Sequence, residues 1–196
     1  MATGPANRVR IIGGRWRGRR IGFPDIPGLR PSPDRVRETL FNWLAPVLPG
    51  ADCLDLFAGS GALGLEAASR GAGRVVLLDA DQRVAVALQE QVRALAAEAL
   101  VEVVRADVLT WLRRASQPFD IVFLDPPFHQ GLVGPCLKAL AAGDWLAPGG
   151  YVYVEAEREM DAERLHTLLP AGWSVYRSKQ AGEVGYHLLQ AGAGVP

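Results

Sequence analysis

DCLDLFAGSGALGLEAASRGAGRVVLLD, residues 52–79, is the stretch from which the fold class follows. An apolar run that reads as a buried strand leads into a glycine-rich turn and then a helix that ends at Gly71. A second apolar strand follows. A strand, a helix and a strand in this order form the unit from which parallel sheets are built. The stretch therefore predicts an α/β protein.

The same alternation continues on both sides of this stretch. Upstream, Ser32 is expected to cap a helix that has Pro33 at its first position and extends to Leu44. Downstream we expect strands at 100–105, 119–125 and 149–156, and helices at 81–99, 108–114, 131–142 and 162–169. Strands that are apolar on both faces predict a doubly wound, Rossmann-like parallel sheet covered by helices on each side.

Hairpins are expected at the two ends of the chain. Two short β-like runs surround Gly13-Gly14, with a tight turn, a bulge or a longer loop between them. Residues 172–179 and 185–190 predict a C-terminal antiparallel hairpin. We therefore expect a mostly parallel sheet that ends in an antiparallel hairpin, preceded by a separate N-terminal hairpin.

The charge is unevenly distributed along the chain. The formal net charge is zero, yet residues 1–40 contain nine arginines and three acids, so that segment carries +6 and the remainder −6. A basic end of this kind indicates contact with a polyanion such as nucleic acid, although arginine-rich ends can also be merely solvated.

Composition argues against several other classes of protein. Two cysteines are too few for a disulfide framework and lack the spacing of a zinc site, and we expect Cys53 to be a small core residue. The histidines show no metal spacing, so no metal is predicted. No stretch approaches the length of a membrane helix. We expect a soluble, cytoplasmic monomer.

The glycine-rich turn predicts a nucleotide-like cofactor. Gly59, Gly61 and Gly64 fit G-x-G-x-x-G between a strand and a helix, and Asp79 ends the next strand, where it can accept hydrogen bonds from ribose hydroxyls. Nicotinamide enzymes and methyltransferases share this pattern. Asp55 favours S-adenosylmethionine, because a carboxylate would repel a pyrophosphate but attract a cationic ammonium group and sulfonium.

Asp107 follows the third predicted strand. It could accept from the adenine amino group, cap the helix at 108–114, or do both, since a cap uses backbone donors.

FLDPPF, residues 123–128, predicts the chemistry. Asp125 and the carbonyl of Pro126 can both accept from an exocyclic amino group, which raises electron density on a nitrogen whose lone pair is delocalised. Pro126 and Pro127 fix the backbone, and Phe128 offers a face for stacking a flipped base. The pattern indicates direct methyl transfer to nitrogen.

Five segments together resemble a known family. RIIGGRWRGRRI, GLRPSPDRVRETLFNWL, CLDLFAGSGALGLEAASRGA, FLDPPF and AGEVGYHLLQ are similar to the RsmD family of bacterial small-subunit (16S) ribosomal RNA guanine-N2-methyltransferases, over almost the whole chain. Family members commonly have Thr-Thr where this chain has Ser32-Pro33, and often Glu where it has Asp79. The resemblance implies a class I methyltransferase domain, residues 31–196, after a basic hairpin extension, residues 1–30.

The resemblance also implies roles for particular residues. Asp125 through Phe128 would hold a guanine of small-subunit RNA, in an assembled or partly assembled subunit. S-adenosylmethionine would be bound by Ser32, Arg35, Asp55, Phe57, Gly59, Gly61, Asp79 and Asp107. RNA phosphates would be gripped by Arg8, Arg10, Arg15, Arg17, Arg19 and Arg20. Trp16 either stacks on a base or anchors the hairpin, and we favour anchoring.

Four alternatives remain open. A DNA amino-methyltransferase usually has an added target-recognition region, for which this chain has no room. A protein glutamine methyltransferase would not need the arginine hairpin. A nicotinamide dehydrogenase would bind NAD. A non-catalytic RNA-binding module would bind RNA without transferring a methyl group.

Overall fold

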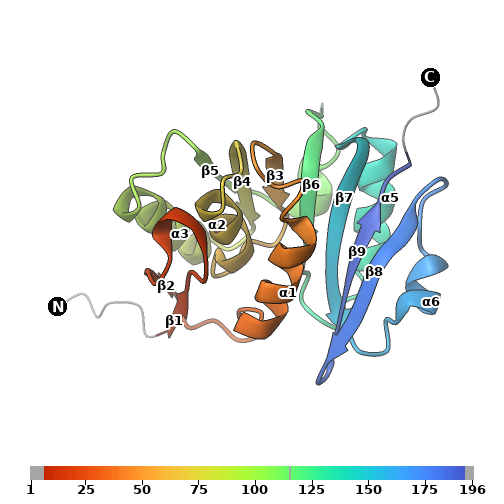
Figure 1. Cartoon of the computed structure of the whole chain (residues 1–196), viewed down its shortest axis with the longest axis horizontal. Helices are drawn as coiled ribbons and strands as arrows, with labels where there is room; N and C mark the ends of the chain where they lie inside the picture. Colours follow the sequence, from red (N-terminus) through yellow and green to blue (C-terminus); the bar gives the residue numbers. More distant parts are fainter. Residues whose placement is uncertain (1–6, 115, 193–196) are drawn as a thin grey trace.

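A computed structural model describes residues 7–114 and 116–192 of the 196-residue chain. Residues 1–6 of the predicted extension lie outside the described residues. The elements, drawn in Figure 1, are β1 (Asn7–Arg10), η1 (Gly14–Trp16, a 3₁₀ turn), β2 (Arg20–Phe23), α1 (Asp34–Leu44), β3 (Asp52–Asp55), α2 (Ala62–Ser69), β4 (Arg74–Asp79), α3 (Gln82–Ala94), β5 (Val101–Arg105), α4 (Val108–Trp111), β6 (Phe119–Leu124), α5 (Val133–Ala142), β7 (Leu146–Glu157), α6 (Ala162–His166), β8 (Ser174–Ala181) and β9 (Val184–Gln190).

The main sheet has seven strands in the order β5-β4-β3-β6-β7-β9-β8. The pairs from β5 to β7 are parallel, and β9 pairs antiparallel with both β7 and β8. The predicted doubly wound sheet with a C-terminal antiparallel hairpin is confirmed. Because the chain moves outward from β3 in one direction and from β6 in the other, the strand order reverses between these two strands.

Helices cover both faces of the sheet, and each face has its own apolar core. One core joins α1, α2 and α3 to inward residues such as Cys53, Leu77 and Phe123. The other joins α4, α5 and α6 to residues such as Leu54 and Val122. Neighbouring residues of one strand enter opposite cores because side chains alternate across a sheet. Cys53 is fully buried, as predicted.

β1 and β2 form a separate antiparallel pair beside α2 and α3 (Figure 1). The predicted N-terminal hairpin is confirmed in the version with a longer loop, which contains η1. Its apolar side chains, among them Ile11, Trp16 and Ile21, belong to the same core as α1 and α2. Trp16 is 7% exposed, so it anchors the hairpin.

The start of α1 differs from the prediction. The helix begins at Asp34, Pro33 occupies the N-cap position, and no side chain caps it. Ser32 is buried and donates its hydroxyl to Glu155 instead. The Ser32 hydroxyl therefore bonds to an acceptor on β7, far along the chain, and does not cap the nearby helix.

No helix within 7–114 and 116–192 has the length and apolarity to cross a membrane.

Candidate functional site

Three acidic residues come together where the strand order reverses. Asp55 ends β3, Asp79 ends β4, and Asp125 directly follows β6. β3 lies between β4 and β6, so all three are at the carboxyl edge of neighbouring parallel strands. Ligands of doubly wound sheets bind at this edge and at this reversal.

Asp55 is buried and only partly satisfied. Its Oδ2 accepts from the backbone N–H of Gly64 at 3.0 Å, whereas its Oδ1 is buried without a hydrogen-bond partner among the described residues. Burial, opposed by the Gly64 hydrogen bond, raises the pKa of Asp55 to about 7. A buried acceptor without a partner is costly unless a ligand completes it. A cationic amino group would do so, which fits the amino acid end of S-adenosylmethionine.

Asp79 shapes the glycine-rich turn. Its Oδ2 accepts from the N–H of Gly59 at 3.0 Å and its Oδ1 from the N–H of Asp81 at 2.9 Å. Asp81 caps α3 by accepting from the N–H of Arg83 at 2.7 Å, so the cap and the strand-end acid are different residues. Burial is the main cause that raises the pKa of Asp79. A carboxylate retains lone pairs for further donors such as ribose hydroxyls.

Gly64 allows α2 to lie close to the sheet. A Cβ atom at this position would lie 2.2 Å from Cδ2 of Leu77 and 3.2 Å from Oδ2 of Asp55. The third glycine of the turn therefore brings the helix against β4 and places its N–H on the Asp55 carboxylate, which is the packing role that this position has in dinucleotide-binding turns.

Three other predicted cofactor residues lie on the surface or near it. Phe57 is half-buried after β3. Asp107 is exposed and caps α4, accepting from the N–H of Thr110 at 2.9 Å, and its hydrogen bonds to Thr110 lower its pKa. Its capping role is confirmed. Arg35 is exposed in the first turn of α1.

The tetrapeptide Asp125–Phe128 leaves β6 at the same edge. Asp125 is half-buried, Pro126 buried, Pro127 exposed and Phe128 half-buried, so the segment passes from the core to the surface within four residues. Burial is the largest cause that holds the pKa of Asp125 well above its ordinary value, and the charges of Glu155 and Asp55 add to it. The pair of prolines keeps this exit rigid.

Glu155 is a buried acid that belongs to none of the sequence motifs. It is 4% exposed, and its Oε2 accepts from the hydroxyls of Ser32 at 2.7 Å and Tyr153 at 2.8 Å. The available signal was an acid within the apolar run 150–156. A charged residue in such a strand is rarely buried without a specific partner.

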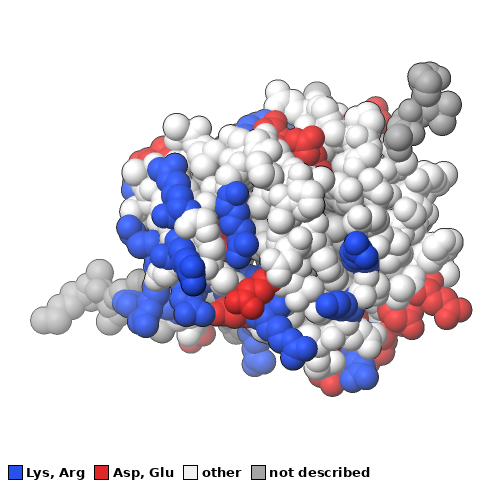
Figure 2. Space-filling view, in the orientation of Figure 1, with Lys and Arg blue, Asp and Glu red and all other residues white. Residues whose placement is uncertain are grey.

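The arginines of the N-terminal hairpin form a basic surface. All six predicted RNA-binding arginines are exposed, and Figure 2 shows blue side chains gathered over this part of the molecule. Arg10 pairs with Asp34 at 2.8 Å, Arg19 donates to the carbonyl of Ala94 at 3.0 Å, and Arg15 lies over the ring of Trp16. Arg8, Arg17 and Arg20 have no ion-pair partner within the described part of the chain.

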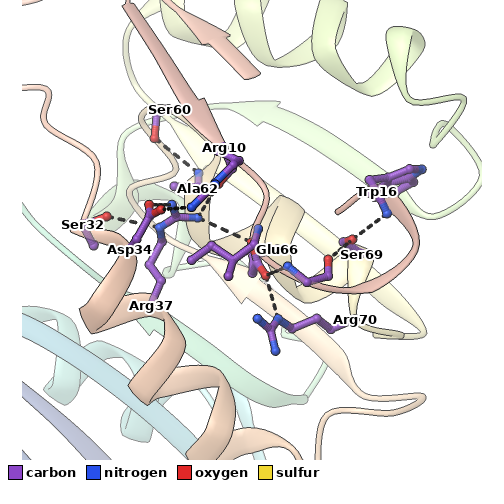
Figure 3. Close-up of polar contacts among 12 residues, drawn as sticks. Arg10, Trp16, Ser32, Asp34, Arg37, Ser60, Ala62, Glu66, Ser69 and Arg70 are labelled. Carbon is purple, nitrogen blue, oxygen red and sulfur yellow. Dashed lines mark hydrogen bonds and ion pairs between the residues drawn. The ribbon is translucent and has the colours of Figure 1, made fainter. Parts of the chain in front are cut away.

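A buried carboxylate clamps this hairpin to α2 (Figure 3). Glu66 is fully buried; it accepts from the N–H groups of Ile12 and Gly13 at 2.8 Å each and from Nε of Arg70 at 2.6 Å, and it pairs with Arg37 at 3.5 Å. Glu66 thus fixes the basic surface relative to the glycine-rich turn, which precedes α2.

Ser69 adds a second attachment. Its hydroxyl donates to the carbonyl of Gly13 at 2.6 Å and accepts from the N–H of Trp16 at 2.9 Å (Figure 3). Gly14 has φ 74° there, and a Cβ would lie 1.9 Å from the Ser69 carbonyl oxygen. Only glycine permits this approach.

A groove of about 590 Å³ lies beside the tetrapeptide. Its walls include Pro126, Phe128, Leu168 and Arg164, and His129 stands at its rim with φ 61°. The N–H of His129 donates to Glu157.

Within 7–114 and 116–192, no three His, Cys, Asp or Glu side chains are arranged to hold a metal ion.

Comparisons with curated proteins give close relatives. Ribosomal RNA small subunit methyltransferase D of Escherichia coli (strain K12) is 49% identical over 185 residues, covering 94% of this chain and 91% of the relative. The protein of the same name from Haemophilus influenzae is 43% identical and covers 93% of each chain.

Solved structures agree with the fold. The Escherichia coli protein yhhF is 46% identical, with a TM-score of 0.85 over 96% of this chain and 100% of that one. The Thermus thermophilus 16S rRNA N2 G1207 methyltransferase, solved with AdoMet and guanosine, is 24% identical, with a TM-score of 0.74 over 97% of this chain and 51% of that one. At that identity the likeness shows a shared fold.

The family model described as Conserved hypothetical protein 95 matches residues 9–190, which include most of the N-terminal hairpin, the glycine-rich turn, the tetrapeptide and the C-terminal hairpin. The chain belongs to this family, that of the ribosomal RNA small subunit methyltransferases D, as its sequence predicts.

Proposed function

We propose that this protein transfers a methyl group from S-adenosylmethionine to the exocyclic N2 amino group of one guanine in small-subunit ribosomal RNA, in an assembled or assembling subunit. Membership of the family supports an S-adenosylmethionine-dependent ribosomal RNA methyltransferase. The observation that supports the chemistry most strongly is the meeting of Asp55 and Asp125 at the strand-order reversal.

The cofactor side of the site is formed by residues of β3, β4 and the turn before α2. Asp55 offers its unpartnered Oδ1 to the cationic amino acid end, and Asp79 offers lone pairs to the ribose. Asp107 can accept from the adenine while it caps α4. Phe57, Gly59, Gly61, Ser32 and Arg35 complete the proposed cofactor set. When bound, S-adenosylmethionine supplies an electrophilic methyl group on a positively charged sulfur.

The base side of the site is the tetrapeptide. Asp125 and the Pro126 carbonyl accept hydrogen bonds from the guanine amino group, Pro127 keeps the turn rigid, and Phe128 stacks on the flipped base. Stacking and two acceptors hold the nitrogen in line with the methyl group. Because the reacting atoms are already oriented, less entropy is lost on reaching the transition state.

The basic hairpin is the element that we propose binds the RNA backbone. Its six arginines lie on one docked element, which we treat as an extension (1–30) of the methyltransferase domain (31–196). Arginine contacts with phosphate supply affinity and register but no base specificity. We propose that the protein acts as a monomer in the cytoplasm, where small subunits assemble.

The decisive experiment offers labelled S-adenosylmethionine to the protein with unmethylated small subunits, with naked RNA from the same source, and with duplex DNA, followed by nucleoside analysis. We expect N2-methylguanosine, formed from subunits in preference to naked RNA. Label found only in DNA, or recovered as methylated glutamine when the subunit proteins are hydrolysed, would contradict the proposal in favour of those two classes.

Asp125→Asn supplies the matched control in the same assay. It keeps the shape of the side chain and should abolish transfer while S-adenosylmethionine affinity stays within a few fold. A non-catalytic RNA-binding module would transfer no label in either form, and a dehydrogenase would bind NAD in place of S-adenosylmethionine.

A further inference from the structure

Asp125 and Glu155 are neighbours across two parallel strands. In the β6–β7 ladder Phe123 pairs with Tyr153 and Leu124 with Val154, so Asp125 and Glu155 are the next residues along. Adjacent strands lie about 4.8 Å apart. Since side chains alternate, both carboxyls point to the face on which Phe123 and Tyr153 are buried, the face that α1 covers.

Glu155 is held as an acceptor by two hydroxyl groups. Ser32 reaches it from the segment before α1 and Tyr153 from its own strand, and both donate to Oε2. Hydroxyl donors stabilise the charged form of a carboxyl group. The two hydrogen bonds therefore favour a negative charge on Glu155, next to a second acid, against the burial that raises its pKa.

The reaction needs a group that accepts a proton at this place. When the methyl group moves from sulfur to the guanine N2, a new C–N bond forms, the S–C bond breaks, and the nitrogen must lose one of its two protons. A carboxylate accepts it more readily when its own pKa is raised toward the working pH. A neighbouring negative charge raises a carboxyl pKa.

We propose that Glu155 is a positioning residue of the catalytic centre, which, fixed by Ser32 and Tyr153, places a negative charge beside Asp125 so that Asp125 takes the proton lost by guanine N2 and later releases it to solvent. This role rests on the proposed function. It assigns a use to the buried acid Glu155 and to the Tyr153 hydroxyl, which the cofactor contacts leave unexplained, and a second role to the Ser32 hydroxyl.

The charged and titratable groups around Asp125 are few. Asp55 faces it from β3 and Glu155 from β7, and Tyr153 and Tyr186 lie next to Glu155 on β7 and β9. Burial raises the pKa of Glu155, while the Ser32 and Tyr153 hydrogen bonds lower it. No cation among the described residues pairs with either acid, so removal of the Glu155 charge should have a visible effect on Asp125.

Glu155→Gln tests the inference because it keeps an acceptor for Ser32 and Tyr153 and removes the charge. We expect the acidic limb of the kcat–pH profile on small subunits to move to lower pH and kcat on the plateau to fall roughly tenfold. The KM for S-adenosylmethionine should stay within a few fold. Glu102→Gln, the same change at an exposed position of β5, should leave the profile in place.

A direct titration provides a readout that does not require turnover. Carboxyl ¹³C NMR, with Asp125 assigned by its loss in Asp125→Asn, should show the Asp125 signal titrating at lower pH in Glu155→Gln than in the wild type. Because coupling is reciprocal, Glu155 should likewise titrate at lower pH in Asp125→Asn. This second variant serves if Glu155→Gln does not fold.

The outcomes separate the two proposals. Unchanged carboxyl titrations together with an unchanged pH profile would overturn the role of Glu155 even if the wild type methylates guanine N2. A wild type that never methylates guanine would overturn the proposed function, whereas the NMR titrations would still decide whether the two acids are coupled.

Discussion

At the scale of single residues, Asp55 is a carboxylate that the protein leaves incomplete. One oxygen holds the N–H of Gly64 and the other is buried without a partner among the described residues. Such an atom lowers stability, and it is retained where a ligand gains from it. Through the proposed cofactor contact, Asp55 would link the stability of the protein to S-adenosylmethionine binding.

Asp55→Asn should weaken S-adenosylmethionine binding about 10- to 100-fold, because it replaces a hydrogen bond to a charged acceptor by one to a neutral amide. Isothermal titration calorimetry measures the loss. Asp52→Asn makes the same change at the opposite end of β3 and should leave affinity unchanged. Equal affinities for wild type and Asp55→Asn would place the amino acid end of the cofactor elsewhere.

At the scale of elements, the hairpin owes its position to α2. Glu66 accepts from two hairpin N–H groups and from the side chains of Arg37 and Arg70, within a region where water does not compete. Removal of one partner of such a network leaves buried charge and buried donors unpaired.

Glu66→Ala should therefore lower the free energy of unfolding by about 3–5 kcal/mol. Urea denaturation followed by circular dichroism measures this change. Glu90→Ala, on an exposed position of α3, should cost little. A Glu66→Ala protein as stable as the wild type would mean that the hairpin is held by its apolar contacts alone.

The N-terminal hairpin also contains the arginines that we propose to bind RNA. Arg17 is exposed and has no ion-pair partner within the described residues, so Arg17→Gln should reduce the slope of log K against log salt for subunit RNA by about 1. Binding at several salt concentrations gives the slope. Arg114→Gln, an exposed arginine after α4, is the matched control. If both changes act alike, the RNA lies on another surface.

At the scale of the whole molecule, the site concentrates acids whose pKa values are raised by burial: Asp55, Asp79, Asp125 and Glu155. In the folded state these groups bind protons more tightly than in the unfolded chain. The folded state therefore holds more protons above the unfolded pKa, and their contribution to stability falls as the pH rises toward each folded pKa.

For Asp55 this window runs from its ordinary 3.8 to about 7. The cofactor-free protein should lose at most about 1.4 kcal/mol of stability per pH unit from this one group within the window. Urea denaturation of wild type and Asp55→Asn from pH 4.5 to 8 measures the difference, which contains the Asp55 titration and the effect of its charge on Asp125. The variant should become the more stable of the two as the pH rises, and parallel curves would refute the prediction.

Much of the fold could be predicted because its causes are local. Gly59, Gly61 and Gly64 between two apolar runs indicate the strand, turn and helix of a cofactor site, and the structure confirms the sheet that follows from them. Asp107 caps α4, as its position predicts. The position of Asp125 and the two prolines after β6 predicted that they lie at the same edge as Asp55 and Asp79, because parallel strands end together.

Periodicity, turn chemistry and short motifs are properties of neighbouring residues, so the fold class and the family could be predicted from the sequence alone. The same motifs supply the residues that we propose for cofactor and base. Tertiary structure alone decided that Ser32 serves Glu155 and not the helix that begins after it, and that Glu66 holds the hairpin. Both are contacts between segments far apart in the chain, 123 residues in one case and 53 or 54 in the other. Once water is excluded, a buried carboxylate takes whichever donors the packing brings to it, and no local pattern names them.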